Sequence, residues 1–282
     1  MPDTDAQTRA LGTPEIVASI LHQMDMRTLI TAQGISRTWK DLICTTQSLQ
    51  ETLFLRPISH DLDLSTRVEN PLLAEAFPSI FDNEEGDICL TDLTWEKNPA
   101  VREMFIRPEA SWRRMLTHQP PLYRVGTFKS RCSPFGWSWS KKKASVPEGG
   151  LRMAPLFEFL IDRSWQAWAY GESIVASFPA SLPGGLLRSN SSKSWNEEER
   201  DWKEMDGQFD LVLEISSSTT CTSEEDYEDG MKEMEEAREK GVVFPDTDLT
   251  VWKRICECYQ ELGLKMDGFK LEKFDEARGM WD

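Results

Sequence analysis

The chain has 282 residues, of which 39% are hydrophobic and 10% aromatic, and its formal net charge at pH 7 is −16. This length allows a small module plus one larger domain, and the hydrophobic fraction is sufficient to build a core. The negative charge argues against a general nucleic-acid binder, because neutralising phosphates requires clustered Lys and Arg. The first residues lack the apolar region of a secretory signal, and no run approaches the ~18 apolar residues of a membrane span. A cytoplasmic or nuclear protein without a membrane partner is therefore expected.

The beginning of the chain is expected to be a disordered leader at residues 1–10, followed directly by a helix. Thr13 is suited to cap this helix, Pro14 to its first position, and Glu15 to the positive end of its dipole. Apolar residues then recur at helical spacing and form one stripe: Ile16, Ile20, Leu21 and Met24.

Two further short helices are predicted before residue 46. Asp25 and Ser36 are suited to cap them, and Gly34 is suited to end the first. The second of these helices has an apolar side made of Ile35, Trp39, Leu42 and Ile43. A short fourth turn is expected before Pro57, which stops it.

Residues 11 to 55 resemble an F-box. The matching residues are Leu11, Pro14-Glu15-Ile16, Ile20-Leu21, Leu29, and Ile35-Ser36-Arg37-Thr38-Trp39-Lys40-Asp41-Leu42-Ile43. The continuation at 48–57 is similar to the fungal subset of this family, and 98–121 with 150–153 looks like a block found in many short fungal F-box proteins. Two departures are mild: Gly12 and Thr13 separate the first Leu from the Pro, and Ser36 stands where Cys is usual. Neither departure removes an apolar anchor.

The resemblance implies that residues 11–56 bind the Skp adaptor (S-phase-kinase-associated protein), which links to a cullin scaffold. The residues expected to face the adaptor are Pro14, Ile16, Ile20, Leu21, Leu29 and Ile35, with Trp39 as a central anchor. A module this short buries too little surface to be robust alone, so a partner with an apolar groove would complete its core. The competing interpretation is that the same residues build the internal core of a helical domain.

The remainder of the chain is predicted to be an acidic linker at 57–94 followed by a mixed α+β domain at 95–282, without sequence repeats and mostly helical overall. Strands are expected at 122–128 and, most clearly, at 209–215, where apolar and polar residues alternate. Residues 129–149 are predicted to be a polar, Lys-rich loop. Helices are predicted from Pro108 to residue 119 and over 151–170, 195–205, 233–240 and 249–262.

No catalytic, cofactor-binding or metal-binding residue is predicted. The six cysteines and three histidines do not form a zinc set, and the cysteines are expected to be reduced thiols. Asp210 and Glu214 invite comparison with a Mg²⁺-dependent nuclease, but no Lys follows the Glu. Two solvated carboxylates are the preferred interpretation of this pair. Among the tryptophans, Trp112, Trp165 and Trp252 fall at core spacing and are predicted to pack internally.

The function favoured by these observations is a non-enzymatic substrate receptor of a Skp–cullin–F-box ubiquitin ligase, whose protein target the sequence does not identify. Two alternatives stay open: an adaptor-bound regulator that acts outside a ligase, and an F-box fused to an unrecognised enzyme domain. The acidic segment Ser216–Asp226 resembles a substrate of acidophilic kinases, and an unmodified polar loop explains it equally well.

Overall fold

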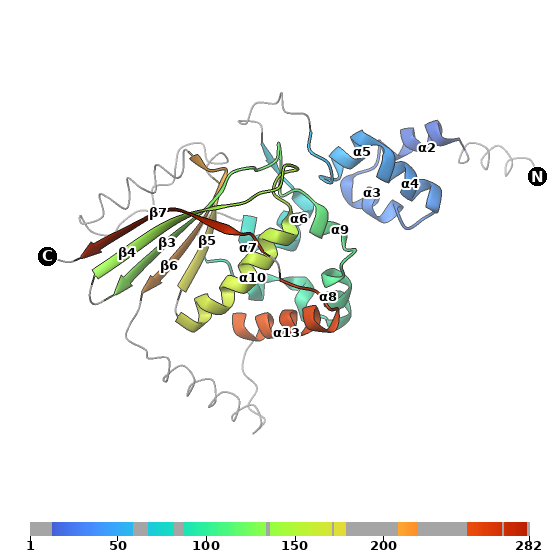
Figure 1. Ribbon diagram of the computed structural model, residues 1–282. Coiled ribbons are helices and arrows are strands. Elements are labelled where there is room, and N and C mark those ends of the chain that lie inside the picture. The colour runs from blue at the N-terminus through green and yellow to red at the C-terminus, as the bar shows by residue number, and fades with distance from the viewer. Residues whose placement is uncertain are drawn as a thin grey trace, which may run out of the picture.

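The chain folds as a mixed α+β protein, in which a cluster of short helices stands beside a larger body that contains a sheet (Figure 1). The computed structural model describes residues 13–58, 67–81, 87–133, 136–170, 172–178, 208–218, 247–266 and 268–280. The predicted α+β class is confirmed. The leader, Leu11 and Gly12, the helices predicted at 195–205 and 233–240, and most of the Ser216–Asp226 segment lie outside the described residues.

The N-terminal module, residues 13–56, contains four short helices in the segments where helical signals were found. These are α2 (Pro14–Leu21), α3 (Met26–Ala32), α4 (Arg37–Thr45) and α5 (Gln47–Thr52). Two of the three predicted caps form, because Asp25 accepts a hydrogen bond from the Thr28 N–H and Ser36 from the Trp39 N–H. The Thr13 side chain makes no capping hydrogen bond to α2. The module has its own core, made of Val17, Leu21, Leu29, Ala32, Ile43, Leu49 and Leu53.

A five-stranded sheet forms one side of the body and has the strand order β5-β6-β3-β4-β7. Its strands are β3 (Val125–Ser133), β4 (Gly136–Ala144), β5 (Glu172–Ser177), β6 (Leu211–Ser218) and β7 (Leu271–Met280). Only the β3–β6 pair is parallel; the other neighbours are antiparallel. A separate antiparallel ladder joins β1 (Val68–Glu69) to β2 (His118–Gln119).

The prediction of a loop at 129–149 is wrong, because most of this segment forms the hairpin of β3 and β4. Its lysines suggest a solvated loop, but in the sheet they belong to a strand paired on both sides. Lys141 is in register with Asp275 and Lys143 with Glu272, whereas Lys142 is in register with Lys273. The strands predicted around 122–128 and 209–215 correspond to β3 and β6, which both run further than predicted.

Helices cover the sheet and connect it to the module. The long α10 (Met153–Tyr170) lies against the sheet beside β5, and α13 (Asp248–Glu261) runs alongside it (Figure 1). The shorter elements are α6 (Pro71–Ala76), α7 (Pro78–Phe81), the 3₁₀ turns η2 (Leu90–Asp92) and η3 (Thr94–Lys97), α8 (Pro99–Ile106) and α9 (Ser111–Arg114). The helix predicted from Pro108 is shorter than expected, since residues 118–119 belong to β2.

The segment predicted as a linker, 57–94, supplies part of the body core. Leu73, Phe77 and Leu93 are at most 2% exposed and pack with the sheet and α10 residues. An aromatic cluster at this core joins Phe77, Trp95, Phe105, Trp112 and Phe157. The predicted burial of Trp112 is confirmed, and the half-buried Trp252 donates its indole N–H to the Ile161 carbonyl at 2.9 Å. The Trp165 side chain lies outside the described part.

Candidate docking surface on the N-terminal module

The N-terminal module carries most of the exposed large apolar side chains that the structure describes. Ile16 is 44% exposed, Ile20 is 37% exposed and Ile35 is 64% exposed. The two others in the described residues are Val68 and Met104, which lie on separate elements of the body. The module thus buries its own core and leaves three isoleucines exposed, two of them on α2 and one in the turn between α3 and α4.

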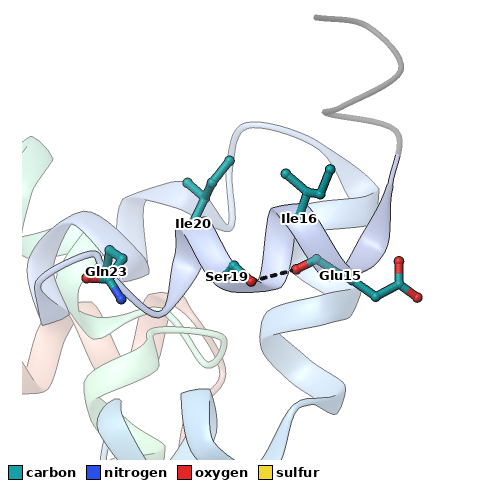
Figure 2. Close-up of a pocket in the computed structure, with 5 residues that line it drawn as sticks. All are labelled: Glu15, Ile16, Ser19, Ile20 and Gln23. Atoms are coloured by element: carbon teal, nitrogen blue, oxygen red, sulfur yellow. Dashed lines mark hydrogen bonds between the residues drawn. The ribbon is translucent and has the colours of Figure 1, made fainter. Parts of the chain in front are cut away.

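Helix α2 divides its apolar residues between two faces. Val17 and Leu21 point into the module core and are fully buried. Ile16 and Ile20, four residues apart, project in a common direction on the outer side of the helix (Figure 2). Together with Glu15, Ser19 and Gln23 they line a shallow surface cavity of about 470 Å³. The Ser19 hydroxyl donates to the Glu15 carbonyl at 2.9 Å, so its polar group is satisfied by its own helix.

Ile35 occupies the turn between α3 and α4. Its N–H donates to the Ala32 carbonyl at 3.1 Å, which ties the turn to the end of α3. Ser36 then caps α4, so the backbone on both sides of Ile35 is fixed. The exposed Ile35 side chain is therefore carried by an ordered backbone.

The structure places the predicted docking residues in two groups. Pro14, Ile16, Ile20 and Ile35 are exposed. Leu21 and Leu29 are fully buried in the module's own core, so their predicted place on the docking surface is corrected. Trp39 is half-buried and packs against the same core.

The physical reason for this division is the packing of α2 on α4. The apolar residues of this helix are predicted to form one stripe, but in the fold they divide between an inner and an outer face of α2, and their spacing does not indicate which residues face inward. Val17, which sequence reasoning omitted, belongs to the inner stripe with Leu21. The signal that could have found it is the same four-residue spacing that links Ile16 and Ile20.

Asp210 belongs to a buried polar cluster in the body, and the expectation that it is solvated is wrong. It is 5% exposed and accepts hydrogen bonds from the Tyr123 N–H at 2.9 Å, the Arg124 N–H at 3.0 Å and the Arg124 guanidinium at 2.9 Å. The Arg67 guanidinium lies 3.5 Å away, with its side chain 3% exposed. Burial by itself raises the pKa of Asp210, but the Arg124 side chain, the two N–H donors and Arg67 outweigh it and lower the pKa.

His118 lies in the same cluster, in β2, and is 1% exposed. Its ring packs against Phe81 and Phe178, with ring centroids 6.0 and 4.7 Å away. Burial and the positive charge of Arg67 lower its pKa to about 3, although Asp210 opposes the shift. The imidazole is therefore neutral at physiological pH and acts as a core side chain.

The thiols of Cys256 and Cys258, on α13, have raised pKa values. Burial, together with the charges of Glu257 and Asp162, raises the pKa of Cys256 to about 12, which keeps the thiol protonated. Burial also raises the pKa of Cys258. Within the described ranges, no three His, Cys, Asp or Glu side chains gather closely enough to hold a metal ion.

Compared with known proteins, the chain matches no family model, no curated protein and no solved structure. None of the described helices combines the length and apolar character needed to cross a bilayer.

Proposed function

We propose that the N-terminal module is an F-box that docks on a Skp-type adaptor, and that the body recruits a protein target for cullin-based ubiquitination. The observation that carries the proposal is the exposure of Ile16, Ile20 and Ile35 on a module whose own core is already formed. The sequence resemblance of residues 11–55 to the F-box family supplies the identity of the partner. Such a complex would act in the cytoplasm or the nucleus.

The energetics of the exposed isoleucines support a partner with an apolar groove. Complete burial of one Ile side chain contributes about 1.5–3 kcal/mol. Because Ile16 and Ile20 are already partly shielded, each contributes less than this, whereas Ile35 has more surface left to bury. Two residues one helical turn apart on α2 fit the mode in which an amphipathic helix lies in a groove.

The mechanism we propose is proximity rather than catalysis by this chain. The module holds the adaptor and the body holds the target, so that a ubiquitin-conjugating enzyme on the cullin meets a target Lys at high effective concentration. An adaptor-bound regulator would use the same docking surface. Recovery of cullin with the chain and ubiquitination of a bound target distinguish the ligase subunit from that alternative.

The docking surface can be tested by co-expressing the chain with the Skp adaptor of its host and measuring affinity. Ile20→Glu and Ile35→Glu each place a carboxylate in an apolar contact, which costs several kcal/mol when unpaired. We expect each to weaken binding by about 10-fold or more, since 1.4 kcal/mol corresponds to a factor of ten.

The matched control is Met104→Glu, because Met104 is 54% exposed on α8 of the body. This variant should bind the adaptor as the unmodified chain does. Circular dichroism would establish that all three variants are folded. If the unmodified chain binds the adaptor and both isoleucine variants bind it with the same affinity, this docking surface is refuted.

A further inference from the structure

The module has a second surface, separate from the docking surface. This second surface packs on the body. Met26 and Ile30 of α3 and Leu55 after α5 contact both the module core and the body core. At the edge of this contact Arg27 of the module pairs with Glu75 of α6. The docking helix α2 lies away from this contact, at the outer end of the molecule (Figure 1).

Four hydrogen bonds also reinforce the contact. In each of them a group of the body donates to a backbone carbonyl in the last residues of the module. The Gln119 side-chain amide donates to the Glu51 carbonyl at 2.9 Å and to the Arg56 carbonyl at 3.0 Å. The Leu116 N–H donates to the Phe54 carbonyl at 2.7 Å, and the Arg152 guanidinium to the Leu55 carbonyl at 3.3 Å. We call these four bonds the module latch. Gln119 supplies two of them and is 7% exposed, so its amide is sheltered from water.

The backbone at the latch adopts a conformation that its own sequence does not favour. Phe54 has φ +57°, a left-handed value that is costly for a residue with a bulky side chain. Its side chain is 9% exposed, and its carbonyl accepts the Leu116 N–H. Within the module the Leu55 and Arg56 N–H groups close this turn by donating to the Gln50 carbonyl at 2.9 and 3.2 Å, and the Leu116 N–H adds a hydrogen bond from the body.

We propose that the body, rather than the adaptor, supplies the surface that the N-terminal module needs for folding. A helical segment of this size is marginal alone, because it buries too small a fraction of its surface. Here the module latch and the contacts of Met26, Ile30 and Leu55 provide the missing burial within the same chain. The docking face carrying Ile16, Ile20 and Ile35 is consequently formed before any partner binds.

A module that is folded before binding affects the affinity for a partner, whatever the identity of that partner. A segment that folds upon binding offsets part of its interaction energy with the cost of ordering its chain. A preformed face avoids that cost. It also means that the chain purified without an adaptor keeps its module folded.

Native-state hydrogen exchange on the full-length chain, without adaptor, tests the inference. The Leu29 and Leu53 amides report on the module, because they donate to the Asp25 and Leu49 carbonyls. Strands β3 and β6 report on the body. In the unmodified chain we expect strong protection of the module amides. In Gln119→Met, which keeps the side-chain length but removes both donors, we expect the module amides to exchange about 10- to 100-fold faster. Protection of β3 and β6 should change much less.

The control is Gln47→Met, because Gln47 is exposed on α5 and donates to the Glu51 side chain at 2.7 Å, within the module. It should accelerate exchange by less than about threefold. Should Gln119→Met fail to fold, Arg152→Met removes a single latch bond, together with the hydrogen bond from the same guanidinium to the Arg114 carbonyl of the body, and should give a smaller acceleration of module exchange. Module amides without protection in the unmodified chain would overturn the inference. So would module exchange that stays unchanged in both latch variants.

Discussion

The buried carboxylate of Asp210 makes the sharpest stability prediction, and Asp210→Asn is the change that tests it. The substitution keeps the shape of the side chain but removes its negative charge. An amide oxygen can still accept the N–H groups of Tyr123 and Arg124, whereas the amide nitrogen cannot accept from a guanidinium. The main loss therefore falls on the ion pairs with Arg67 and Arg124.

The magnitude follows from the burial of the two arginines. The Arg124 side chain is 49% exposed and can turn to water, but the Arg67 side chain is 3% exposed and cannot. Removing one partner of a buried pair typically costs about 3–5 kcal/mol, because it leaves an uncompensated charge. We expect Asp210→Asn to lower the free energy of unfolding by about 3 kcal/mol. The midpoint temperature should fall by about 6–12 °C for a chain of this size.

Urea unfolding at pH 7, followed by tryptophan fluorescence, measures the effect. Asp41→Asn is the control, because Asp41 is exposed on α4 and its substitution should change stability by less than about 0.5 kcal/mol. Adding Arg67→Met to Asp210→Asn should recover part of the loss, since it removes the buried charge. A loss below about 1 kcal/mol for Asp210→Asn, or a further loss in the double variant, would refute the reasoning.

Two other predictions concern the body. The folded-state pKa of His118, about 3, lies below the ordinary value of 6.5, so the unfolded chain binds the extra proton and stability falls as pH drops from about 6.5 toward 3. Between pH 6.5 and 5 the slope should approach about 1.4 kcal/mol per pH unit in urea titrations and flatten in His118→Gln; equal slopes would contradict this. Gly150→Ala should cost about 2–4 kcal/mol by thermal unfolding, because φ is +84° and a Cβ would lie 2.4 Å from the Pro121 Cβ. Gly263→Ala, at φ +64° with no neighbour within 4 Å, should cost only the conformational part, and equal losses would exclude the predicted clash.

The helices of the N-terminal module could be predicted because their signals are local. Asp25 and Ser36 accept hydrogen bonds from N–H groups three residues ahead, which is a property of a few adjacent residues. Pro14 starts α2 for a similarly local reason. Such features depend on few residues outside the segment itself, so the positions of α2 to α4 could be predicted from the sequence.

The β3–β4 hairpin could not be predicted in the same way, because its stability comes from distant strands. Residues 129–149 are polar and contain several lysines, which is typical of a loop when the segment is considered alone. In the fold β3 pairs with β6, and β4 pairs with β7, each more than seventy residues away. Neither contact leaves a mark within the hairpin itself. The linker predicted at 57–94 differs from the fold for a related reason. Pro71 and Pro78 suggest breaks between short ordered pieces, but each begins a helix.

The docking surface could be predicted from the sequence only in part. Helix α2 has apolar residues at 16, 17, 20 and 21, which is more than one buried face requires. That excess is visible in the sequence and predicts a second contact for the helix. The direction of each stripe is not visible, because Ile16 with Ile20 and Val17 with Leu21 have the same spacing. Packing of α2 against α4 buries Val17 and Leu21. Ile16 and Ile20 therefore stay exposed, and they are the residues of α2 that remain for a partner.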